Sequence, residues 1–244
     1  MRALRAQIVA EISMTLRRGE TLLLTLGIPL ILLVFFSQIT LVSTKGVRPV
    51  DLTTPGILAL AIMSTSMVSL GIATGFERGY GVLKRLGATP LGRGRLLAAK
   101  IAGVAIVEVL QAIVIVAVGL LLGWQPSGGF LGGLEVAAAC ILGSIAFGGI
   151  GLAMAGRLRA EINLAAANGL YLILLLLGGM VVPLSTLPGP IRAVAEVLPA
   201  AALSATLHGA VGPTSGYAGC WLVLIAWAIA MPIVASVTFR FEGD

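Results

Sequence analysis

The sequence predicts an all-α integral membrane protein that crosses the bilayer six times. Three observations support this fold class. Of the 244 residues, 58% are hydrophobic and only 11% are charged, whereas a soluble domain carries about 25% charged residues. The apolar residues form continuous runs of about 20, the length that a helix needs to cross the hydrocarbon layer. The Lys and Arg residues stand between these runs, as they do in the loops of membrane proteins.

Six apolar runs are long enough to span the membrane. They cover residues 21–42, 55–75, 97–123, 130–155, 164–182 and 217–239. A transmembrane β-barrel is not expected, because its strands are about ten residues long and alternate strictly between apolar and polar. We therefore expect one membrane domain over residues 1–244.

The cations predict the orientation. With six spans, thirteen of the sixteen Lys and Arg residues fall on one side and three on the other. Since positive loops stay cytoplasmic, both termini are expected in the cytoplasm of a cell-membrane protein. The formal charge of +6 is explained by this asymmetry, and no nucleic-acid partner is expected. The first group contains Arg2, Arg5, Arg17, Arg18, Arg78, Lys84, Arg85, Arg93, Arg95, Lys100, Arg157, Arg159 and Arg240, and the second contains Lys45, Arg48 and Arg192.

Two segments outside the spans carry helical patterns. Residues 2–18 place apolar side chains at every fourth position among charges, which is typical of an amphipathic helix in the membrane interface; a basic flank that only fixes the topology is the alternative. Residues 181–216, on the extracellular side between spans five and six, are broken by Pro and predict short helices near 191–197 and 200–208. We expect these helices at the outer leaflet.

Motifs for catalysis are missing. The sequence has no GxxxxGK[ST] loop to hold the phosphates of a nucleotide, and neither HExxH nor GxSxG occurs. Cys140 and Cys220 lie inside apolar runs, and His208 is the single histidine, so no metal site is expected. The sequence therefore predicts neither an enzyme nor a bound cofactor in this chain.

A few polar residues lie at membrane depth. Glu108 stands near the middle of the third run, and Gln111 follows on the same helical face. With Ser66 in the second run and Tyr171 in the fifth, they are candidates for a polar substrate path, since ionisable groups inside the membrane are costly and often functional. The alternative is a carboxyl group that is hydrogen-bonded between packed helices and never touches cargo.

Small residues also recur at four-residue spacing within the runs. The pairs are Gly71 and Gly75, Gly119 and Gly123, and Ser144 and Gly148. We interpret them as sites of close helix packing.

The segment FERGYGVLKRLGATPLGRGRLLAAK, residues 76–100, holds six of the sixteen cations. Topology alone does not explain its order, in which an apolar and basic stretch is followed by Pro90 and a second basic turn. This order predicts a short amphipathic helix, a proline break and a re-entry into the membrane. Such a cytoplasmic knob is suited to docking another protein.

The chain resembles the permease subunit of ABC type-2 exporters in three places. ERGYGVLKRLGATP resembles the coupling segment of that family, VVPLSTLPGPIRAVAEVLP resembles its extracellular segment before the last span, and residues 2–18 resemble its interfacial helix. Lys84 departs from the pattern, because many relatives carry an acid there. The coupling residues that the resemblance implies are Glu77, Gly81, Val82, Leu83, Lys84, Arg85, Leu86, Thr89 and Pro90.

The resemblance implies a mechanism. Two permease copies, identical or related, would form the path in the lipid, and separate ATPase chains carrying ATP and Mg would push on the coupling segment. The cargo would be hydrophobic or amphipathic, drug-like or lipid-like. An ion-coupled secondary transporter, which would want several intramembrane charges and internal repeats, and a membrane scaffold without transport are the alternatives.

Overall fold

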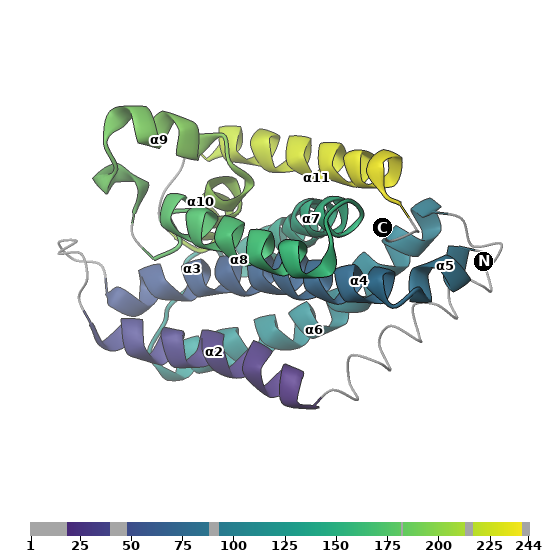
Figure 1. The fold of residues 1–244 in the computed structure, drawn as a ribbon. Coiled ribbons are helices and arrows are strands. Elements are labelled where there is room, and N and C mark those ends of the chain that lie inside the picture. Colours follow the sequence, from purple (N-terminus) through teal and green to yellow (C-terminus); the bar gives the residue numbers. More distant parts are fainter. Residues whose placement is uncertain (1–18, 40–47, 88–92, 182, 213–216, 241–244) are drawn as a thin grey trace.

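The computed structural model describes residues 19–39, 48–87, 93–181, 183–212 and 217–240. Within these ranges every regular element is helical, and the long helices run roughly side by side (Figure 1), which confirms the all-α class. The predicted interfacial helix at residues 2–18 lies outside the described residues. The elements are α2 (Gly19–Gln38), α3 (Pro49–Met63), η1 (Ser64–Ser69), α4 (Leu70–Gly79), α5 (Val82–Gly87), α6 (Arg93–Leu121), α7 (Gly129–Ala155), α8 (Ala160–Leu177), η2 (Leu184–Thr186), α9 (Gly189–Glu196), α10 (Pro199–Val211) and α11 (Ala218–Thr238).

The described residues hold five to six candidate membrane spans. Five helical segments are long and apolar enough: Pro49–Gly79, Gly94–Leu121, Gly129–Ala155, Ala160–Leu177 and Ala218–Thr238. Helices α9 and α10 meet the same criteria as a pair, although they are bent by 82°. Helix α2, on the first predicted run, is 20 residues long and contributes the shorter apolar stretch Thr25–Gln38. The two short helices predicted before the last span correspond to α9 and α10.

The second span is longer than the predicted residues 55–75. Helices α3 and α4 continue into each other through η1, so one helical segment runs over 31 residues from Pro49 to Gly79. The prediction began the second span at Pro55 and left Pro49 outside it, but proline fits the first turn of a helix, where its missing N–H would have no partner. Pro55 lies inside α3, as lipid-embedded helices tolerate.

The helices alternate in direction and define two ends of the bundle. Helices α4, α7 and α11 finish at one end, where α6 and α8 begin and α5 lies; we call it the elbow end, on the right in Figure 1. Helices α9 and α10 lie at the opposite end, the α9 end. The elbow end carries nine of the eleven Lys and Arg residues in the described part of the chain. They are Arg78, Lys84, Arg85, Arg93, Arg95, Lys100, Arg157, Arg159 and Arg240, and the α9 end has Arg48 and Arg192.

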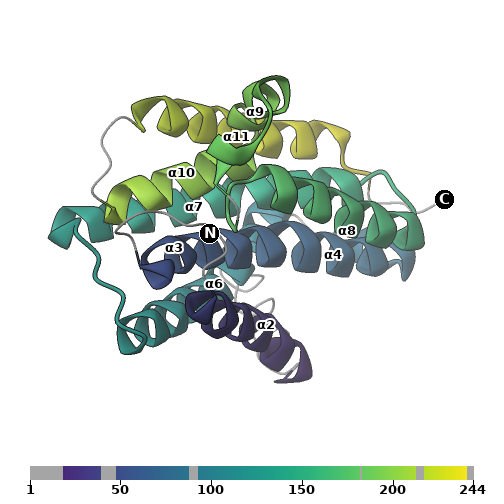
Figure 2. The same cartoon turned by 90° about the vertical axis from the view of Figure 1, so that its left-hand side faces the viewer.

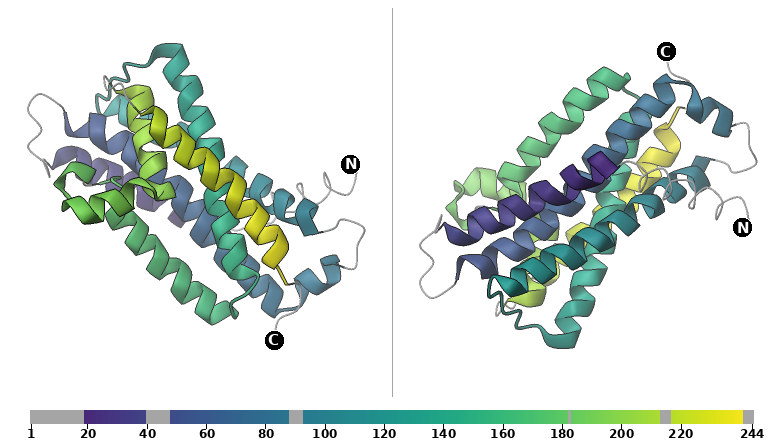
Figure 3. Two further views of the ribbon diagram at one scale, coloured as in Figure 1. Left: turned by 90° about the horizontal axis from the view of Figure 1, so that it is seen from above. Right: turned by 90° about the horizontal axis from the view of Figure 1, so that it is seen from below.

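The segment Pro49–Gly79 and helix α7 form the centre of the bundle. Of the most apolar 18 residues in Pro49–Gly79, 72% are buried within the protein, whereas the share is 17% for both α8 and α11. Helix α11 packs along α7, and α2 and α6 pack against α3 (Figures 2 and 3). The outer helices are therefore left with wide apolar faces for lipid or for another membrane chain.

Two glycines allow the central helices to approach closely. An added Cβ at Gly71 would lie 3.1 Å from the Cα of Gly151, and one at Gly151 would lie 2.5 Å from the carbonyl oxygen of Met67. The separation at Gly151 is too short for a side chain and the one at Gly71 is tight, so backbone meets backbone here. Small residues at such contacts are typical of membrane helices, because packing replaces the hydrophobic effect as the source of association.

We expect Gly151→Ala to destabilise the fold. The new methyl group must displace the backbone around Met67, and overpacking of this kind costs about 1–3 kcal/mol. Gly133→Ala, on the same helix with no atom within 4 Å of the added Cβ, is the matched control. Thermal unfolding of the purified chain in detergent should show a lower midpoint for Gly151→Ala only, and equal midpoints would contradict the close contact.

Candidate functional site

A group of polar side chains lies halfway along the central helices. We call it the midmembrane cluster, and its members, all buried, are Thr65, Ser66, Glu108, Gln111 and Ser144. The hydroxyl of Ser66 donates a hydrogen bond to Oε1 of Glu108, and it lies 3.0 Å from the hydroxyl of Ser144. Segment Pro49–Gly79, α6 and α7 thus meet through three side chains.

Gln111 extends the midmembrane cluster to the first helix. The hydroxyl of Thr65 donates to Oε1 of Gln111 over 3.0 Å, and Nε2 of Gln111 donates to the carbonyl oxygen of Thr25 in α2 over 2.8 Å. The side chain of Gln111 is only 1% exposed, so a hydrogen bond lost here would leave a polar group without water to replace it. The amide consequently links α2, η1 and α6.

The local backbone explains why Thr65 and Ser66 reach their partners. Over Ser64–Ser69 the helical hydrogen bonds widen into a π-helical turn, an irregularity that often occurs at functional sites. Glu108 lies about halfway along α6, and Ser144 lies about halfway along α7. The midmembrane cluster is therefore at the depth where polar groups are most expensive, and its members satisfy one another.

The candidate path residues are only partly brought together. Ser66, Glu108 and Gln111 belong to the midmembrane cluster, whereas Tyr171 is on α8 and packs with the apolar core. Ser144 was interpreted from the sequence as a packing residue and not as part of a path. Glu108 and Ser144 also line a groove between α6, α7 and α11, so the carboxyl group borders a space as well as a helix contact.

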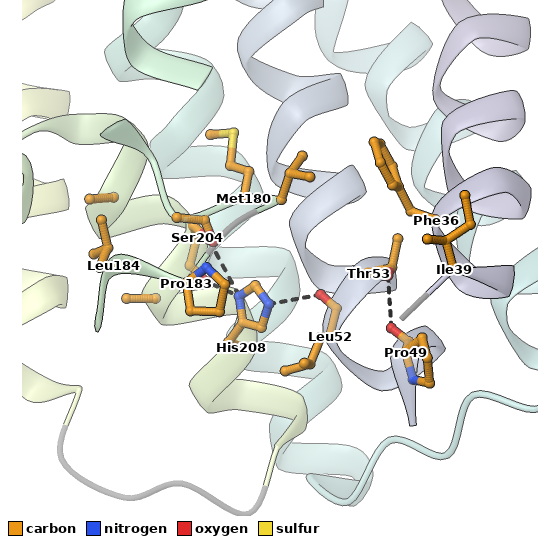
Figure 4. Close-up of a pocket in the computed structure, with 14 residues that line it drawn as sticks. Phe36, Ile39, Pro49, Leu52, Thr53, Met180, Pro183, Leu184, Ser204 and His208 are labelled. Atoms are coloured by element: carbon orange, nitrogen blue, oxygen red, sulfur yellow. Dashed lines mark hydrogen bonds between the residues drawn. The ribbon is translucent and has the colours of Figure 1, made fainter. Parts of the chain in front are cut away.

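A second pocket, of about 240 Å³, lies at the α9 end (Figure 4). Its walls come from the last turn of α2, the start of α3, residues 179–181, 183 and 184, and α10. His208 of α10 joins two elements here: Nδ1 lies 2.7 Å from the carbonyl oxygen of Ser204, and Nε2 lies 2.9 Å from that of Leu52 in α3. The imidazole thus holds α10 against α3 at the pocket wall.

At the elbow end, α4 turns into α5 at a glycine. Gly81 has a φ of +72°, a left-handed conformation that glycine adopts without strain. In α5, Leu83 is fully buried and packs against leucines of α4, α6 and α7, while Val82, Lys84 and Arg85 are exposed. Leu83 therefore fixes α5 to the bundle, and its neighbours form the outer surface.

The other predicted coupling residues differ in position. Leu86 belongs to α5, whereas Thr89 and Pro90 lie outside the described residues. Glu77 accepts a hydrogen bond of 2.6 Å from Nζ of Lys100 in α6. Its carboxylate is thus paired with a residue of the same chain, next to α5 at the elbow end.

The charged pair and a neighbouring arginine hold the elbow end together. The side chain of Lys100 is only 1% exposed, and that of Glu77 is 23% exposed. Arg78 donates to the carbonyl oxygens of Gly156 over 2.6 Å and Leu158 over 2.8 Å. These bonds connect α4 to α6 and to the turn between α7 and α8. The pairing of Lys100 with Glu77 was not predicted from the sequence, although the two residues lie on either side of α5 in the chain.

Lys100→Gln should destabilise the fold by about 3 kcal/mol, because removing one partner leaves the other charge partly buried and unpaired. Arg95→Gln, an exposed change on the same helix, should have little effect. The double variant Glu77→Gln/Lys100→Gln should recover part of the loss, as expected for coupled partners. Chemical unfolding in detergent measures all three, and equal losses for Lys100→Gln and Arg95→Gln would contradict a structural role for the pair.

Comparison with known proteins identifies the family. The family model described as ABC-2 type transporter matches residues 2–209. The chain is also 25% identical over 203 residues to the Bacillus subtilis (strain 168) protein named "Putative transport permease YvfS", which covers 82% of this chain and 81% of that protein. The resemblance drawn from the sequence is confirmed. The protein belongs to the ABC-2 type transporter family and is a multi-pass membrane transport permease, not a catalytic subunit.

Proposed function

We propose that this chain, as a single transmembrane domain over residues 1–244, is the permease of an ATP-driven exporter. A separate ABC ATPase chain binds ATP and Mg and supplies the energy, and the permease moves a hydrophobic or amphipathic molecule, drug-like or lipid-like, out across the cytoplasmic membrane. Membership of the ABC-2 type transporter family is the observation that carries this proposal, since permeases of this family associate with an ATPase.

The charge distribution supports an orientation with the elbow end in the cytoplasm. Nine of the eleven described Lys and Arg residues lie at that end, and cytoplasmic loops carry the excess of positive charge. Both chain termini belong to the same side in this proposal. Helices α9 and α10 then lie at the extracellular side, together with the pocket around His208.

Helix α5, at the elbow end, offers a surface for the ATPase. Helix α5 presents Lys84 and Arg85 outward, and buried Leu83 and the pair of Glu77 with Lys100 fix its base to three helices. A firmly held, exposed basic helix transmits a push into the bundle better than a loosely attached loop does. We therefore assign ATPase coupling to α5 and the residues that follow it, and to the interfacial helix predicted at residues 2–18.

The outer helices leave room for a second permease copy. Leu172, Ile173 and Leu176 of α8 are exposed apolar residues, and such a face requires lipid or another membrane chain. Two copies, identical or related, would enclose the path for the cargo between them or at their lipid-facing sides.

Transport measured in inverted membrane vesicles tests the proposed function. Vesicles that contain the permease and its copurified ATPase should accumulate a hydrophobic dye or a lipid analogue when ATP is added, and vesicles with either chain alone should not. Accumulation driven by an ion gradient without ATP would favour a secondary transporter. ATP hydrolysis by the purified permease alone would contradict the assignment of the energy source.

Charge reversal on the elbow should weaken the association with the ATPase. For Lys84→Glu/Arg85→Glu we expect about tenfold less ATPase recovered with the tagged permease, because reversed charges at an interface repel a complementary partner. The amount of permease in the membrane should not change. Arg192→Glu, an exposed change at the α9 end, is the control, and normal ATPase recovery with the double variant would place the contact elsewhere.

A further inference from the structure

The groove beside Glu108 is large enough to hold a ligand. It has a volume of about 880 Å³, within the range of about 300–1,000 Å³ that is typical of ligand pockets. Its walls run along α6 from Gly94 to Ile113 and along α7 from Gly133 to Leu152, and residues 232–236 of α11 complete it. Since α6 rises by about 1.5 Å per residue, the groove extends over most of the thickness of the hydrocarbon layer.

The described walls of the groove are mostly apolar and contain one acidic side chain. Glu108 is the only acidic or basic residue among the described residues that line it. Cys140, Ser144 and Ser236 supply the remaining polar atoms. A hydrophobic body can therefore bind anywhere along the groove, whereas a positively charged group finds, among the described lining residues, a complementary partner only at Glu108.

The contacts of Glu108 with the other described residues include no counter-ion. The carboxyl group is hydrogen-bonded by Ser66, and within the described part of the chain no Lys or Arg forms a salt bridge with it. Lys100, on the same helix, pairs with Glu77 instead. Hydroxyl groups hold a carboxylate in place but do not neutralise it, and an uncompensated charge at membrane depth is expensive.

We propose that this groove is a binding site for lipophilic cations, and that Glu108 is the counter-ion that selects them. The inference rests on the proposed function, because it names the charge of the exported molecule. The apolar walls take the hydrophobic body of the ligand, and the carboxylate takes its positive charge in a low-dielectric surrounding, where the attraction is strong. Anions of the same shape are repelled by the same group.

Two ions of nearly the same shape and opposite charge test the selection. Tetraphenylphosphonium and tetraphenylborate should be titrated onto the full-length chain in nanodiscs of zwitterionic lipid, with binding to empty nanodiscs subtracted. The protein should bind the cation at least about tenfold more tightly than the anion. Glu108→Gln, which keeps an oxygen for Ser66, should weaken cation binding about tenfold and leave anion binding unchanged or stronger.

A matched control and a second variant separate charge from shape. Glu135→Gln removes a carboxylate that lies outside the groove and accepts a hydrogen bond from Tyr217, so it should leave cation binding unchanged. Ala137→Phe, which fills the groove from α7, should weaken binding of both ions. The thermal midpoint of each variant should be measured so that unfolding is recognised.

The thiol of Cys140 reports directly on the groove. In a Cys220→Ala background, tetraphenylphosphonium should slow alkylation of Cys140 by a membrane-permeant maleimide, and tetraphenylborate should not. This readout tests the proposal even if Glu108→Gln does not fold. Equal protection by both ions, or cation binding that is unaffected by Glu108→Gln in a folded variant, would overturn it and indicate a groove that holds lipid chains or another copy of the protein.

These outcomes can be distinguished from failure of the proposed function. Binding is measured without ATP and without the ATPase. If cations bind through Glu108 but ATP drives no transport, the export function is wrong and the site remains. If ATP-driven transport occurs without any preference for cations at Glu108, only this inference is overturned.

Discussion

The contact between helix α7 and the segment Pro49–Gly79 is the constraint on which the rest of the structure depends. At Gly71 and Gly151 the two backbones approach so closely that a side chain on either would collide with the other helix. Because lipid is as apolar as leucine, helices in a membrane associate through such packing and through hydrogen bonds. The contact fixes the relative position of the helices, and this position places Ser66 beside Ser144.

Buried polar side chains find hydrogen-bond or ionic partners within the protein both in the middle of the bundle and near the elbow end. Water is not present in the hydrocarbon layer to satisfy a hydroxyl or an amide, so each must find its partner within the protein. Thr65 and Ser66 do this in the middle of the bundle with Gln111 and Glu108. Near the elbow end, buried Lys100 is satisfied by a salt bridge with Glu77. The midmembrane cluster borders a groove, and the pair of Glu77 with Lys100 supports the exposed helix α5. In both places, polar side chains are satisfied by partners within the protein.

Much of the fold could be predicted from the sequence, because lipid demands long apolar helices and these are visible as uninterrupted runs. The helix that holds the second predicted span begins at Pro49, before the predicted start at Pro55, because proline is also compatible with the first turn of a helix. The spacing of Glu108 and Gln111 indicated one helical face, and both side chains do meet the π-helical turn. Ser144, the partner of Ser66, was not recognised as a polar contact, because a serine among glycines and alanines looks like a packing residue.

Other features depend on contacts that no spacing reveals. The pattern around Leu83 indicated an amphipathic helix, but only the packing of α5 shows that this leucine faces the bundle. Glu77 was assigned to the coupling segment by the family resemblance, and only the structure shows that its carboxylate accepts a hydrogen bond from Lys100. Tyr171 was grouped with the path residues by its hydroxyl, whereas on α8 it is half-buried and packs against the apolar core.

The segment Pro49–Gly79 contacts the pocket at the α9 end, the midmembrane cluster and the elbow end. The carbonyl oxygen of Leu52 lies beside His208, Ser66 donates to Glu108, and Arg78 donates to the turn after α7. At about 1.5 Å per residue its 31 residues measure about 45 Å. One continuous helical segment thus reaches from one end of the bundle to the other. Because the segment is helical along its whole length, it mechanically joins the elbow end to the pocket around His208, and the π-helical turn over Ser64–Ser69 lies midway between them.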